Sequence, residues 1–137
     1  MGRAAFLGYC AVSLLLFGHE AQTQEIRTVA VHGSTETRIG RHASADNNCY
    51  PRGIPHVSTA KKPLHGSVDV RVENVKMDNI IGGGTFCLGR TVEGTVVYFK
   101  PMPGYHGPDS VSYHVEYPSR GSYRGRVEDR TVNISVQ

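Results

Sequence analysis

Alternation of apolar and polar residues at a period of two is the dominant pattern along this chain. Residues 67–73, 110–117 and 131–136 each place valine or another apolar or aromatic residue at every second position. Successive side chains of a β-strand point to opposite faces, so such segments form strands with one buried and one solvated face. The side chains expected to face inward are Val68, Val70, Val72, Val111, Tyr113, Val115, Val132, Ile134 and Val136.

Three further segments have strand character, and no segment shows a helical period. Residues 95–99 are apolar on both faces and predict a central strand, whereas 26–31 and 55–60 predict weaker early strands. The stretch 33–48 has no readable pattern. Glycine- and proline-rich turns separate the strands, at 51–53, 62–66, 82–84 and 101–104. Short strands joined by such turns predict an all-β fold, a β-sandwich of about seven strands.

The N-terminus has the layout of a secretory signal peptide. Arg3 precedes an apolar run over 6–17, and a short stretch that ends at Ala21 follows it. The run is shorter than the roughly 20 apolar residues that span a bilayer. We therefore expect a signal peptide over 1–21 and one exported domain over 22–137, periplasmic or extracellular, with no membrane span after signal removal. The alternative is a buried N-terminal helix or strand.

Cysteine usage agrees with export. The chain has three cysteines, and removal of the signal peptide takes Cys10 and leaves Cys49 and Cys87. An even number of cysteines in a small exported chain predicts a disulfide, and the alternative is a pair of free buried thiols. A bridge from Cys49 to Cys87 closes a loop of about 39 residues, which the chain-entropy argument values at about 4 kcal/mol.

The net charge and the distribution of basic residues exclude few classes of function. The chain carries 15 basic and 12 acidic residues, a formal net charge of +3. The basic residues are scattered and form no stripe, which argues against nucleic-acid binding and allows weak attraction to anionic envelope surfaces.

One long segment resembles a known family. Residues 98–115, YFKPMPGYHGPDSVSYHV, resemble the signature of bacterial Ig-like (cadherin-like) domains, and residues 63–68, PLHGSV, are similar to the start of an upstream strand in that family. The resemblance covers residues 55–137. It implies an immunoglobulin-like β-sandwich in a small, single-domain exported version, and it implies no chemistry, because function lies in sites and not in folds.

The resemblance also implies a structural corner at Asp109 and Tyr113. In immunoglobulin domains the corresponding tyrosine is buried and its hydroxyl bonds to nearby backbone, which here would lie in the loop 101–107. Val115 occupies the place of the second sandwich cysteine, and the chain has no tryptophan. The predicted Cys49–Cys87 bridge therefore joins other positions than the usual inter-sheet bridge.

No group of residues predicts catalysis, a cofactor or a metal site. The histidines after the signal peptide lack the short spacings of metal ligands; they are His32, His42, His56, His65, His106 and His114. The asparagine-rich stretches 46–48 and 78–79 each hold a single acid, fewer than a calcium site usually needs. His106, Asp109 and Ser110 lie within one turn, where their side chains diverge.

The remaining candidate is an interaction patch around the C-terminal hairpin. Tyrosine and arginine dominate binding hot spots, and the hairpin holds Tyr117, Arg120, Tyr123, Arg124 and Arg126, with Tyr105 nearby as a further candidate. We expect an exported, non-enzymatic module with a structural role or with protein or envelope-surface contacts. The alternatives are a periplasmic metal-binding protein that uses dispersed histidines and, third, a small secreted hydrolase. The sequence identifies neither the partner nor the oligomeric state.

Overall fold

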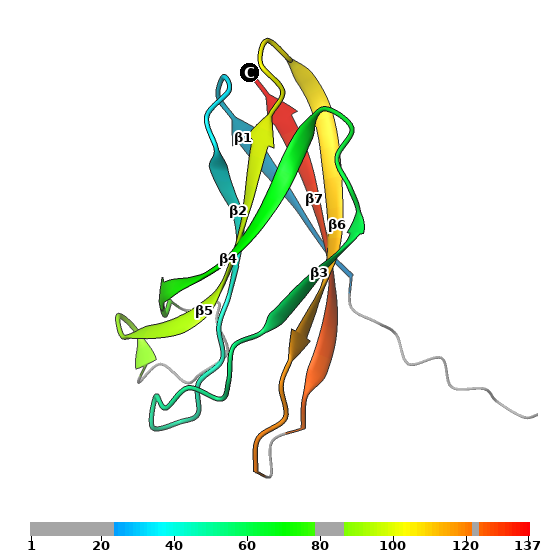
Figure 1. The fold of residues 1–137 in the computed structure, drawn as a ribbon. Helices are drawn as coiled ribbons and strands as arrows, with labels where there is room; N and C mark the ends of the chain where they lie inside the picture. Colours follow the sequence, from blue (N-terminus) through cyan, green and yellow to red (C-terminus); the bar gives the residue numbers. More distant parts are fainter. Residues whose placement is uncertain (1–23, 79–86, 122–123) are drawn as a thin grey trace, which may run out of the picture.

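The residues that the structure describes form seven strands in two sheets (Figure 1). The computed structural model describes residues 24–78, 87–121 and 124–137; the expected signal peptide over 1–21 and the glycine-rich tip at 82–84 lie outside them. The strands are β1 Gln24–Val31, β2 Thr37–His42, β3 His56–Lys61, β4 Gly66–Lys76, β5 Thr91–Pro101, β6 Gly107–Tyr117 and β7 Arg126–Val136. None of the residues described lies in an α-helix.

The two sheets pack face to face as a β-sandwich. One sheet has the strand order β1-β7-β6-β3 and the other β2-β5-β4. β1 runs parallel to β7, and the other neighbouring strands pair in antiparallel fashion. The all-β sandwich predicted from the alternation is confirmed, and β5 is the central strand of its sheet, as its two apolar faces predicted.

The main core lies between the sheets and follows the predicted alternation of β6 and β7. Val111, Tyr113 and Val115 of β6 are at most 3% exposed, and the alternate residues of β7 match them. The other members come from every strand except β4; the full cluster is Val31, Ile39, Val57, Val97, Phe99, Val111, Tyr113, Val115, Tyr117, Val132, Ile134 and Val136. Burying apolar side chains at this density is the main stabilising term of such a domain.

The valines of β4 lie on the core-facing side of their sheet as predicted, because they pair with Phe99, Val97 and Thr95 of β5, but their burial is incomplete. Val68 packs against the main core, but Val70 is 38% and Val72 57% exposed. β4 is an edge strand of eleven residues, whereas β3, the last strand of the other sheet on that side, has six. β3 is therefore too short to cover the whole length of β4, which leaves Val70 and Val72 exposed.

β2 is the strand that the sequence pattern did not reveal. It lies within the unreadable stretch 33–48, and its pairing with β5 shifts register between Arg38 and Gly40. Such a bulge adds a residue to one strand and breaks the alternation. Ile39, Gly40 and His42 are consequently buried, although they do not follow a period of two.

A disulfide between Cys49 and Cys87 pins one end of the sandwich, as predicted. The two Cα atoms are 5.4 Å apart, a usual separation for a disulfide. A second apolar cluster surrounds the bond. Its members are Ala43, Ala45, Val75, Met77, Cys87, Val92 and Val96.

Reduction of this disulfide should lower the free energy of unfolding by about 2–4 kcal/mol, because the bond closes a long loop in the unfolded chain. Urea melts of the oxidised and reduced protein measure the difference. The Cys49→Ala, Cys87→Ala double variant provides a second form without the bond. Coincident melts would show that the second apolar cluster alone holds this end.

Candidate functional site

Asp109 ties the start of β6 to the turn between β3 and β4. Its carboxylate accepts hydrogen bonds from the backbone N–H groups of Leu64, His65 and Ser110, at 3.0, 2.7 and 2.8 Å. Burial alone would raise the pKa of Asp109, but these donors outweigh it and the pKa lies below its usual value. The residue is engaged with backbone, so its contacts are those of a structural anchor.

Tyr113 is buried as predicted, but the predicted partner of its hydroxyl is wrong. The hydroxyl lies 3.2 Å from Nε2 of His42, and not against backbone of the loop 101–107. The ring points across the sandwich toward β2, where Gly40 leaves room for it: a Cβ atom on Gly40 would lie 2.3 Å from the tyrosine oxygen. The hydroxyl-to-backbone bond near that loop is made instead by Tyr105, which donates to the carbonyl of Pro108 at 2.6 Å.

His42 is the buried polar centre of the sandwich. It is 6% exposed, its Nε2 contacts the hydroxyl of Tyr113, and its Nδ1 lies 3.5 Å from the hydroxyl of Tyr117. Burial lowers the pKa of His42 to about 4, and the carboxylate of Glu128 opposes part of this shift. A neutral imidazole has one N–H and one acceptor nitrogen, so one tyrosine donates to the ring and the other accepts from it.

A cleft opens above these three side chains, between β2 of one sheet and β1 and β7 of the other. Its volume is about 520 Å³, within the range of about 300–1,000 Å³ that is usual for small-molecule sites. The floor is formed by His42, Tyr113 and Tyr117, and charged side chains of the three strands form much of the walls. This cleft could not be predicted from the sequence, because β2 was not recognisable as a strand.

Among the residues described, Tyr117 is the one member of the predicted interaction patch that the structure places in the core. Tyr117 is only 7% exposed, and the guanidinium of Arg126 lies over its ring at 4.1 Å. Alternation along β6 directs Tyr117 into the main core, which is why it is unavailable to a partner. Arg120 and Arg124 are exposed, and Tyr123 lies outside the described residues.

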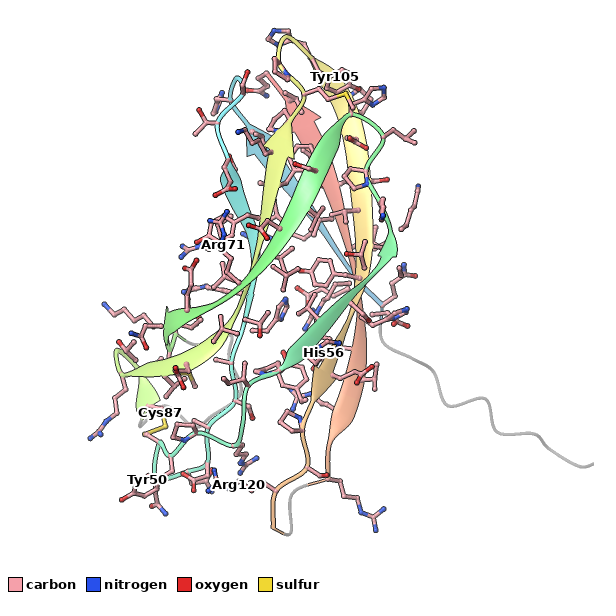
Figure 2. The ribbon with its side chains drawn as sticks, in the orientation of Figure 1. Tyr50, His56, Arg71, Cys87, Tyr105 and Arg120 are labelled. Carbon is pink, nitrogen blue, oxygen red and sulfur yellow. A yellow bond between two sulfur atoms is a disulfide. The ribbon has the colours of Figure 1, made fainter. Side chains whose placement is uncertain are left out.

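Large apolar side chains are exposed instead beside the disulfide. Tyr50 is 69%, Ile54 42% and Leu88 48% exposed. Figure 2 shows Tyr50, Cys87 and Arg120 together at one end of the sandwich, with Tyr105 at the opposite end. We call the surface formed by Tyr50, Ile54, Leu88 and Arg120 the disulfide-end surface.

The loop that carries Tyr50 is held in place by its own hydrogen bonds. The carboxylate of Asp46 accepts from the backbone N–H groups of Asn48 and Tyr50, at 2.8 and 2.9 Å. Arg120 donates to the carbonyl of Pro51 at 2.7 Å and joins this loop to the β6–β7 hairpin. Asp46 therefore caps a turn, which is the ordinary role of aspartate in such stretches.

The histidines lie apart from one another on the described strands and turns. His114 pairs with Asp129 at 2.5 Å, and His65 stacks on Tyr105 with 4.0 Å between ring centroids. Across residues 24–78, 87–121 and 124–137, no three histidine, cysteine or acidic side chains are placed to hold one metal ion. Within the same residues, no helix is long and apolar enough to cross a membrane.

Comparison with protein-family models, curated proteins and solved structures finds no match to this chain. The resemblance to bacterial Ig-like domains therefore rests on the motif residues between 55 and 137 alone.

Protonation of His42 should make the stability of the domain depend on pH. The pKa of His42 is about 4 in the folded state and about 6.5 in an unfolded chain. Between these values the unfolded chain binds more protons, so the free energy of unfolding should fall by about 3 kcal/mol as the pH drops from about 6.5 to 4.

Urea melts across this pH range measure the effect, with two variants for comparison. His42→Gln keeps a hydrogen-bonding side chain without a titrating group and should lose this pH dependence. His106→Gln removes an exposed histidine and should keep it. Equal pH dependence in His42→Gln and the parent would contradict the assignment.

Proposed function

We propose that this chain is an exported, non-enzymatic Ig-like interaction domain that binds a protein partner at the cell envelope through the disulfide-end surface. The observation that carries the proposal is the exposure of Tyr50, Ile54 and Leu88 on loops fastened by a disulfide. Exposed apolar side chains that gather in one place mark interaction sites more often than scattered ones do.

Rigidity of the loops supports this assignment. The disulfide, the Asp46 cap and the bond from Arg120 to Pro51 hold the backbone on both sides of Tyr50 before any partner arrives. A pre-ordered loop loses less conformational entropy on binding, so more of the contact energy appears as affinity. Tyrosine adds a large contact area with few rotatable bonds.

The opposite end of the sandwich provides a useful comparison. Leu64 is 73% and Met102 51% exposed there, in turns near Tyr105. Leucine is under-represented among binding hot spots, whereas tyrosine and arginine are enriched. Tyr105 at the opposite end packs against the main core, whereas Tyr50 is 69% exposed, and this difference favours the disulfide end as the binding surface.

Export is supported by the disulfide and by the N-terminal pattern. Disulfides persist in oxidising compartments such as the periplasm and the medium. Residues 1–21 have the order of charge, apolar run and polar end that is typical of a signal peptide. The Ig-like motif between 98 and 115 agrees with a small exported sandwich module. The alternative of a metal-binding protein stays a prediction that rests on the dispersed histidines.

Site-specific photo-crosslinking in the native cells tests the binding surface. A photoreactive amino acid at position 50 should give a defined crosslinked product, and the same group at position 64, equally exposed at the opposite end, should not. The Ile54→Ala, Leu88→Ala double variant should reduce the position-50 product, since it removes the neighbouring contacts. Products of equal yield from positions 50 and 64, or none from position 50, would contradict the proposal.

Mass spectrometry of the exported protein tests the compartment and the processing. The mature chain should begin near residue 22 and lack Cys10. Without prior reduction, alkylation should modify neither Cys49 nor Cys87, because both are in the disulfide. Recovery of a peptide that contains Cys10 from exported protein would exclude the signal peptide.

A further inference from the structure

The cleft between β2 and the β1–β7 pair is lined by more basic than acidic side chains. Five arginines from three strands reach it: Arg27 of β1, Arg38 and Arg41 of β2, and Arg126 and Arg130 of β7. The acidic residues that line it are Glu25, Asp78 and Glu128. At neutral pH the cleft thus carries two more positive than negative charges, most of the net charge of +3 of the whole chain.

Three of the arginines are paired within the cleft. Arg41 pairs with Asp78, Arg126 with Glu128, and Arg130 with both Glu25 and Glu128. Each acidic side chain that lines the cleft takes part in at least one of these ion pairs.

Arg27 and Arg38 stand on different walls, on β1 and β2, and both are exposed. Neither has an ion-pair partner among the residues described. Arg27 and Arg38 therefore account for the excess of basic over acidic side chains that line the cleft.

The guanidinium of Arg130 is not fully hydrogen-bonded within the protein. Its Nε is buried and has no hydrogen-bond partner, although the other two nitrogens of the guanidinium bind carboxylates. A buried N–H without an acceptor destabilises its present arrangement.

The remaining lining suits hydroxyl groups better than apolar ones. The carboxylates of Glu25, Asp78 and Glu128 have more lone pairs than their arginine partners use, and they can accept from ligand hydroxyls. The floor presents the imidazole of His42 and two tyrosine hydroxyls. Its imidazole is neutral at physiological pH, so the positive charge of the cleft lies in its walls.

We propose that this cleft is a binding site for a small hydroxylated oxyanion, a sugar that bears a carboxylate or phosphate group. The arginines, led by Arg27 and Arg38, hold the anionic group, because a guanidinium matches carboxylate and phosphate oxygens with two parallel hydrogen bonds. The acidic residues accept from the sugar hydroxyls. The site is distinct from the disulfide-end surface, and either can exist without the other.

Isothermal titration with defined probes tests the site at fixed ionic strength. The probes are galacturonate, glucose 6-phosphate and the neutral sugar galactose, with polygalacturonate as a polymer. At least one charged monosaccharide should bind, and galactose should not. Tighter binding of polygalacturonate per site than of galacturonate would identify an envelope polysaccharide as the source of the ligand, and equal binding would identify a free sugar acid.

A matched pair of double variants separates the cleft from general positive charge. Arg27→Gln with Arg38→Gln should weaken binding by about tenfold or more, since each loses a charged hydrogen-bond donor. Arg90→Gln with Arg124→Gln removes the same charge from exposed positions that do not line the cleft and should leave the affinity within about twofold. Equal weakening in both pairs would overturn the proposal.

Nuclear magnetic resonance on the unchanged protein gives a readout that does not depend on the folding of a variant. The side-chain Nε–H signals of Arg27, Arg38 and Arg130 should shift on addition of the bound sugar, and that of Arg90 should not. No shift in the three cleft arginines, or no binding of any charged probe at millimolar concentration, would also overturn it.

Discussion

The contact of Tyr113 with β2 is the interaction on which the rest of the structure depends. Tyr113 extends from the middle of β6 across the sandwich, and only a glycine at position 40 lets its ring approach the opposite strand so closely. Its hydroxyl then meets His42, 71 residues away in sequence. This contact fixes where β2 lies relative to the other sheet, and the residues that follow β2 lead directly into the turn at Asp46 and the disulfide.

The geometry of both the cleft and the disulfide-end surface depends on this position of β2. The outward side chains of β2, Arg38 and Arg41, form one wall of the cleft, and its last residue, His42, forms the floor. Ala43 and Ala45 then belong to the second apolar cluster, on which the disulfide-bonded loop rests. Register pairing places Val75, Val92 and Val96 of that cluster on the face of β4 and β5 opposite to Val70 and Val97. The second apolar cluster thus covers that face of the three-stranded sheet near the disulfide.

The features that could be predicted from the sequence depend either on local residue patterns or on the even number of cysteines. Alternation identified β6 and β7 and their buried faces, two apolar faces identified β5 as central, and the even cysteine count identified the Cys49–Cys87 bond. β2 was missed because its bulge breaks the period of two. The exposure of Val70 and Val72 was missed because the burial of an edge strand depends on the length of the opposite sheet, and no local pattern in the sequence indicates that length.

The hydrogen-bond partner of Tyr113 and the shape of the cleft depend on contacts between strands that are far apart in sequence. The same contacts determine which positions in the cleft can carry a charged side chain. An imidazolium at position 42 would be costly to bury without a carboxylate beside it. Two tyrosine hydroxyls satisfy the neutral ring instead, so the floor of the cleft holds no charge that needs compensation. Charge is confined to arginines and acids on the walls, where water still reaches part of each side chain. A cleft built in this way keeps an excess of guanidinium groups accessible without destabilising the core beneath them.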